Sequence, residues 1–111
     1  MNLKREDQGN VVLLQVKEER LDAHNADELK QELAGLFAGG KNGVVVDLKE
    51  VRFIDSSGLG ALVSGFKNAS ARQADLKLSG LQSQVKSMFE LTRLHRVFAI
   101  YTTMDEALAS F

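Results

Sequence analysis

The chain has 111 residues, of which 44% are hydrophobic, and its 14 Lys and Arg against 15 Asp and Glu give a formal net charge of -1. The absence of Cys excludes thiol catalysis, Cys-based metal sites and a disulfide framework, and it favours a cytoplasmic location. The even charge balance indicates no nucleic-acid surface, and no apolar run approaches the roughly 20 residues that a membrane span requires.

The first third of the chain predicts a β-hairpin followed by a helix. Residues 11–16 form a β-branched apolar run after a Gly-Asn pair, and residues 1–7 are placed to pair with it as the other arm of the hairpin. Residues 18–22 are polar and are expected to form a connector. Apolar residues at helical spacing then predict a helix from about residue 26 to 37, with Asn25 as N-cap, Glu28 as its reciprocal partner and Gly39 near the stop.

The rest of the chain alternates strands with helices. Residues 44–48 form a short apolar run typical of a central parallel strand, and residues 49–53 are expected to connect it toward a helix over about 57–71. Residues 76–79 predict a strand, residues 82–91 a helix and residues 97–101 a last strand. Thr103 and Glu106 have the spacing of a capping box, which predicts a short final helix.

This alternation predicts an α/β fold with a small mixed, largely parallel β-sheet flanked by about four helices. A chain of this length buries about two thirds of its unfolded surface, so it can build a core without a metal or a disulfide. We therefore expect residues 1–111 to form a single domain.

The segment DSSGLG, residues 55–60, is hard to explain by packing alone. It lies where a strand gives way to a helix, at the sheet edge where ligands gather in α/β folds. Asp and Ser are ordinary N-cap residues, and Ser56 or Ser57 is expected at that position. However, Gly58 and Gly60 should each cost roughly 0.5–1 kcal/mol relative to Ala in a helix. Two such residues indicate that something approaches the backbone closely.

Three kinds of contact fit this segment. A nucleotide phosphate site is disfavoured, because the spacing and the Lys of a phosphate-binding loop are absent. A nucleophilic Ser is disfavoured too, because the Gly-x-Ser-x-Gly pattern is missing and His24 and His95 lie in unrelated contexts. Neither His has a second ligand at metal-binding spacing. The third kind is a hydroxyl that another protein phosphorylates, which needs only an exposed Ser and a recognisable surface.

The sequence resembles the STAS domain family, specifically the bacterial anti-sigma factor antagonists. The resemblance is carried by VVVDL at residues 44–48, by VRFIDSSGLG at residues 51–60 and by the start of the first helix around Asp22, and it extends over essentially the whole chain. It implies the STAS-like fold. It also implies a protein that is not an enzyme and that is itself phosphorylated.

The resemblance assigns a role to each position that matches the motif. Ser56 is the implied phosphoacceptor, with Ser57 as its rival. The implied partner-binding residues are Asp22, Asp55, Ser57, Gly58, Leu59 and Gly60. The implied partners are an anti-sigma factor serine kinase, which supplies the ATP and divalent metal, and a PP2C-type phosphatase. No cofactor, metal, nucleic acid or membrane insertion is implied for this chain, which is expected as a monomer or weak dimer.

Two other functions fit the same motif. One is a partner-switching module that controls a different output, such as a response regulator, a secretion system or a signalling complex. The other is a non-phosphorylated scaffold of a transporter complex, against which the intact Ser56 argues.

Overall fold

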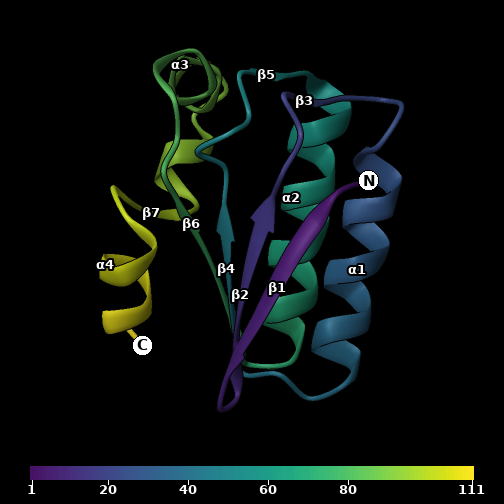
Figure 1. The fold of residues 1–111 in the computed structure, drawn as a ribbon, viewed down its shortest axis with the longest axis vertical. Helices are drawn as coiled ribbons and strands as arrows, with labels where there is room; N and C mark the ends of the chain where they lie inside the picture. The colour runs from purple at the N-terminus through teal and green to yellow at the C-terminus, as the bar shows by residue number, and fades with distance from the viewer.

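A five-stranded sheet forms the centre of the computed structural model, which describes all 111 residues. The strands lie in the order β1-β2-β4-β6-β7, and only the β1–β2 pair is antiparallel (Figure 1). Their bounds are β1 Leu3–Gln8, β2 Val11–Val16, β4 Gly43–Asp47, β6 Asp75–Ser79 and β7 Ala99–Tyr101. The expected α/β fold with a mixed, largely parallel sheet is confirmed.

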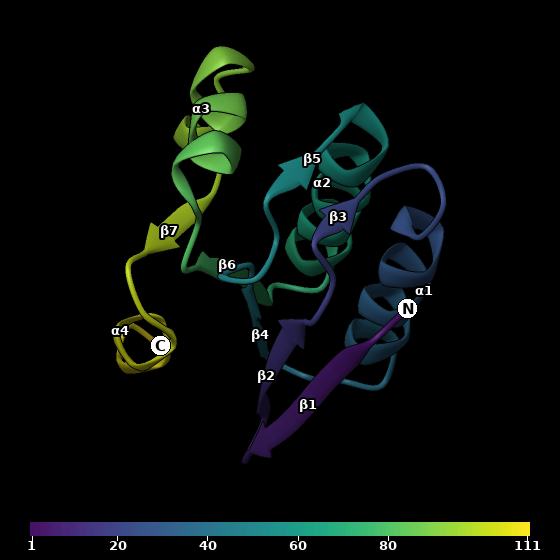
Figure 2. The same ribbon diagram turned by 45° about the horizontal axis from the view of Figure 1, so that its top comes forward.

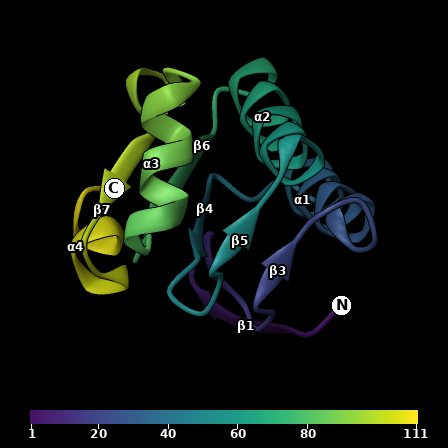
Figure 3. The same cartoon turned by 90° about the horizontal axis from the view of Figure 1, so that it is seen from above.

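The helices are divided unequally between the two faces of this sheet. Helices α1 and α2 lie together on one side and α4 lies on the other, with α3 near the β7 edge (Figure 3). Their bounds are α1 Ala26–Ala38, α2 Ser56–Ala71, α3 Ser83–Leu91 and α4 Met104–Ala109, and a short 3-10 turn, η1, spans Leu94–Arg96. None of the helices combines the length and apolar character needed to cross a bilayer.

The core follows the alternation of strand side chains between the two faces. The α1–α2 face joins one cluster of 21 buried residues, whereas the α4 face holds a cluster of only three, Leu13, Val45 and Ala107. Strand β4 is buried along its whole length. The run at residues 44–48 lacks polar alternation because both of its faces are covered.

A second, two-stranded sheet has no counterpart among the elements predicted from the sequence. Strand β3, Arg20–Leu21, pairs in parallel with β5, Phe53–Ile54, and the two lie side by side beside the start of α2 (Figure 2). The sequence predicts a connector for each of these segments. Strands of two residues each are too short to show a period of two, so the sequence carries no signal for this ribbon.

Asn25 occupies the N-cap position of α1 as predicted, but the predicted capping hydrogen bonds of α1 are absent, whereas the hydroxyl cap predicted for α4 is present. The Asn25 side chain makes no cap hydrogen bond; its Oδ1 instead accepts from the Asp22 backbone N–H at 3.0 Å. Glu28 pairs with the amino group of Met1 at 2.7 Å rather than with its own helix start. In α4 the Thr103 hydroxyl accepts from the Glu106 N–H at 3.1 Å, as the capping spacing predicts.

A charge cluster on the outer strand β1 includes one contact, with Lys41, to the segment after α1. The Asp7 carboxylate forms ion pairs with Arg5 Nε at 2.6 Å and with Lys41 Nζ at 3.2 Å. The hydrogen bond from Arg5, aided by Lys41, lowers the pKa of Asp7 from 3.8 to about 2. A carboxylate with a lowered pKa favours folding above pH 3.8, and this contribution is lost as the pH falls through about 2.

The titration of Asp7 tests this cluster. We expect its carboxyl resonance to titrate with a midpoint near 2, and we expect Arg5→Met to move the midpoint toward 3.8, with a smaller shift for Lys41→Met. The measurement is an NMR pH titration of the side-chain carboxyl. A midpoint of 3.8 in the unsubstituted protein would show that the cluster does not form.

Candidate functional site

The β3–β5 ribbon brings two acidic residues that are distant in the sequence to one place. Leu21 and Ile54 are partners in its register, so Asp22 and Asp55, which follow them, emerge side by side. The Asp55 backbone N–H donates to the Leu21 carbonyl at 3.3 Å. The pairing places both residues beside the N-terminal end of α2, where the sequence predicts the site.

Asp55, rather than either Ser, is the N-cap of α2. Its backbone is extended, and its Oδ1 accepts from the Gly58 N–H at 3.0 Å. The expectation that Ser56 or Ser57 forms the cap is therefore wrong. The helix begins at Ser56, and both Ser residues are exposed in its first turn. An Asp with β-region backbone is as good a cap as Ser, so the hydroxyls stay free.

The two glycines of the segment have different roles. A Cβ on Gly58 would lie 2.5 Å from the Leu21 carbonyl oxygen and 2.7 Å from the Ile54 side chain, so this position packs against the ribbon. A Cβ on Gly60 would meet nothing within 4 Å. The close approach inferred from the sequence is thus internal at Gly58, while Gly60 leaves open space at the surface.

That open space belongs to a shallow groove between α1 and α2. The groove has a volume of about 360 Å³ and is lined by Ala23, Ala26, Asp27, Lys30, Ser57, Gly60 and Ala61. Small side chains form most of it, and Asp27 and Lys30 supply one charge of each sign. The sequence singles out neither charged residue, because on an exposed helix face each has the pattern of a solvated residue.

An aromatic-cation pair beside the site also escapes sequence reasoning. The Arg20 guanidinium lies 4.5 Å from the centre of the Phe53 ring, which remains 41% exposed. An exposed Phe inside an expected connector has no periodicity to identify it. The pair extends the site along the ribbon away from α2.

The structure divides the predicted site residues into a surface group and a buried group. Asp22 is half-buried, and Asp55, Ser56, Ser57 and Gly60 are exposed around the start of α2. Gly58 and Leu59 are buried, and Leu59 belongs to the main core cluster. These two shape the helix start and offer no side-chain surface.

Local hydrogen bonds fix the turn that carries Asp22. Its Oδ1 accepts from the His24 backbone N–H at 3.0 Å, and the Asn25 amide donates to the Arg20 carbonyl at 2.8 Å. The turn is therefore fixed, and the Asp22 carboxylate is engaged within it. No three His, Asp or Glu side chains gather in a way that would hold a metal ion.

Comparisons with known proteins give a match over almost the whole chain. The STAS domain family model matches residues 2–107. The anti-sigma-B factor antagonist of Listeria monocytogenes is 36% identical over 88 residues, covering 78% of this chain and 75% of that protein.

Two solved proteins share the fold. An anti-sigma factor antagonist from Mycobacterium paratuberculosis superposes with a TM-score of 0.87 at 25% identity, covering 98% of this chain and 92% of that one. The unphosphorylated form of the anti-sigma factor antagonist SpoIIAA superposes with a TM-score of 0.83 at 18% identity, covering 96% and 93%.

Replacing each of the two glycines by Ala should change the free energy of unfolding in opposite directions. Gly58→Ala should destabilise the fold by about 1–3 kcal/mol, because the methyl group meets a backbone oxygen that cannot move aside. Gly60→Ala should stabilise it by about 0.5–1 kcal/mol, because Ala is the better helix residue and the space is open. Urea unfolding of both variants measures the two changes. A shift of the same sign in both would contradict the difference between the positions.

Proposed function

The chain belongs to the STAS domain family, and on that premise we propose that it is an anti-sigma factor antagonist that is switched by phosphorylation of Ser56. In its unphosphorylated form it binds an anti-sigma factor serine kinase. The kinase brings the ATP and the divalent metal, and phosphorylation releases the complex. A PP2C-type phosphatase then removes the phosphate from Ser56.

One observation carries this proposal: the first turn of α2 already has its cap. Because Asp55 accepts the Gly58 N–H, the Ser56 hydroxyl is not used for the fold. It is exposed at the first helical position, between Asp55 and the groove that Ser57 lines. A phosphoacceptor needs this combination of a free hydroxyl and a fixed, recognisable surrounding.

The same position explains why a phosphate need not unfold the protein. Phosphorylation adds about -1.5 to -2 charge at neutral pH. At a helix N-terminus the free N–H groups and the positive end of the dipole accommodate an anion. The phosphate is therefore tolerated by α2 but alters the surface that the kinase contacts, where Asp22 and Asp55 already supply negative charge.

Ser56 variants test the switch. We expect the kinase and ATP to add one phosphate to the unsubstituted chain and to the Ser57→Ala control, and none to Ser56→Ala. Ser56→Asp should bind the kinase roughly 100-fold more weakly, because a fixed charge is desolvated at the interface. Its unfolding midpoint should match that of the unsubstituted chain. Mass spectrometry, calorimetry and thermal unfolding are the three measurements.

Two outcomes would contradict the switch. Tight kinase binding by Ser56→Asp would show that charge at this position does not release the partner. A lack of label at Ser56 with every encoded kinase would favour a non-phosphorylated scaffold of the same fold.

Gly60 provides an independent test of the docking surface. If the kinase uses the α1–α2 groove, Gly60→Ala should lower kinase affinity by roughly tenfold, because a methyl group fills contact space. Gly35→Ala is the matched control, since Gly35 is also an exposed helical glycine at which an added Cβ would meet nothing within 4 Å. Calorimetric titration of both variants measures the difference. Equal affinities would place the kinase elsewhere.

A further inference from the structure

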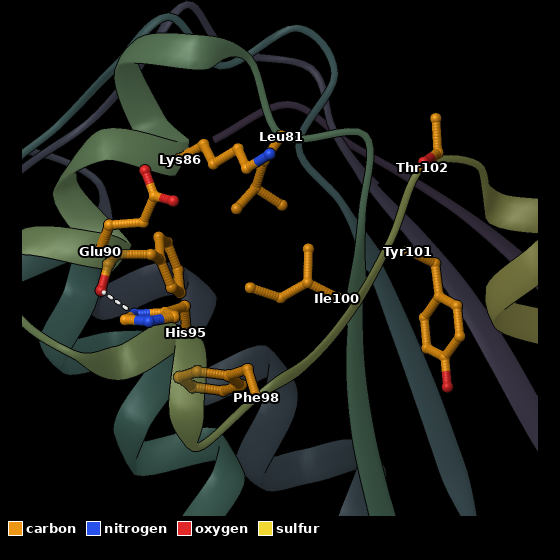
Figure 4. Close-up of a pocket in the computed structure, with 9 residues that line it drawn as sticks. Leu81, Lys86, Glu90, His95, Phe98, Ile100, Tyr101 and Thr102 are labelled. Carbon is orange, nitrogen blue, oxygen red and sulfur yellow. Dashed lines mark hydrogen bonds between the residues drawn. The ribbon is translucent and has the colours of Figure 1, made fainter.

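A second cavity lies at the β7 edge of the sheet, between α3, η1 and β7. Its volume is about 580 Å³, and it shares no residue with the groove beside Ser56. It is lined by Leu81, Lys86, Phe89, Glu90, His95, Phe98, Ile100, Tyr101 and Thr102 (Figure 4). Cavities of roughly 300–1,000 Å³ with an apolar lining and a few polar groups are typical small-ligand sites.

The floor of this cavity is apolar and rigid. Phe89 and Phe98 are buried and pack edge-to-face with their ring centres 5.7 Å apart. Leu81 and Ile100 are half-buried and complete the apolar wall. A floor built from core residues keeps its shape when a ligand enters, which lowers the entropy lost on binding.

The rim carries two opposite charges that have no partner within the protein. Lys86 and Glu90 are one turn apart on α3 and both line the cavity. The four ion pairs of the protein involve other residues, and neither of these two side chains makes a hydrogen bond. Two unpaired charges of opposite sign above an apolar floor match a ligand that carries both charges and an apolar group.

His95 adds a polar group of fixed orientation. Its Nδ1 lies 3.2 Å from the Phe89 carbonyl oxygen. Because a carbonyl oxygen can only accept, Nδ1 carries the hydrogen, which leaves Nε2 free for another partner. Figure 4 shows the ring at the wall of the cavity between Glu90 and Phe98.

We propose that this cavity binds a free α-amino acid with an apolar side chain, such as leucine. Lys86 binds the carboxylate of the ligand and Glu90 binds its ammonium group. The ligand side chain packs on Leu81 and Ile100. The site is independent of the phosphorylation proposed at Ser56. A simple anion leaves Glu90 unpaired, and a simple cation leaves Lys86 unpaired.

Two readouts follow occupancy of this site without a label. The single tyrosine, Tyr101, is not one of them, because its side chain points away from the cavity and packs toward α4 (Figure 4). Calorimetry measures binding directly, and NMR chemical-shift changes of the side chains that line the cavity provide the second readout. The ligands to compare are L-leucine, 4-methylpentanoate, which lacks the ammonium group, and 3-methylbutylamine, which lacks the carboxylate.

We expect saturable binding of L-leucine and roughly tenfold weaker binding of each analogue, the loss that follows from one missing charged hydrogen bond. Lys86→Met should weaken leucine but not 3-methylbutylamine, and Glu90→Gln should weaken leucine but not 4-methylpentanoate. Lys67→Met, an exposed lysine of α2 outside the cavity, should leave all three affinities unchanged. Circular dichroism checks that each variant is folded.

Three results would overturn the assignment. The first is the absence of saturable leucine binding by both readouts. The second is equal affinity for leucine and either analogue, which would indicate an amphipathic ion rather than an amino acid. The third is loss of affinity in Lys86→Met or Glu90→Gln that does not distinguish the ligands, which would mean that the two charges do not contact them.

Discussion

The approach of the Gly58 backbone to the Leu21 carbonyl is the contact on which the candidate phosphorylation site depends. With a hypothetical Cβ only 2.5 Å from that oxygen, no other residue fits without moving the ribbon. The contact holds β3 against the start of α2 and so places Asp22 beside Asp55. The helix begins at Ser56 with Asp55 as its cap, so the Ser56 hydroxyl is not needed for the fold.

Most of the fold could be predicted, because its elements are long enough to show a period. The helical spacing through residues 26–37 and the unbroken apolar run at residues 44–48 identify α1 and β4, and alternation of strands and helices then gives a parallel sheet. The ribbon β3–β5 could not be predicted, because two residues per strand carry no pattern. Its existence depends on tertiary pairing.

The sequence locates the site but does not distinguish the roles within it. Ser and Asp are about equally favoured at the N-cap, so the sequence does not choose between them. The extended backbone of Asp55 identifies it as the cap. Gly58 and Gly60 are likewise identical in sequence terms. The space around an absent Cβ is a property of the neighbours, Leu21 in one case and solvent in the other. For the same reason the sequence does not show that Lys86 and Glu90 share a cavity, because that cavity forms only where β7 and η1 pack beside α3.

The shortness of the ribbon has a consequence for motion. Two residue pairs join β3 to β5, whereas β4 pairs along its full length with both neighbours. The side chains of the ribbon are nevertheless anchored, because Leu21 is fully buried and Ile54 is 9% exposed in the main core cluster. The weak part of the ribbon is its short ladder of backbone hydrogen bonds, since short ladders open locally at a lower free energy than long ones. Its amide protons should therefore exchange before those of β4, while the surroundings of Ser56 keep their shape.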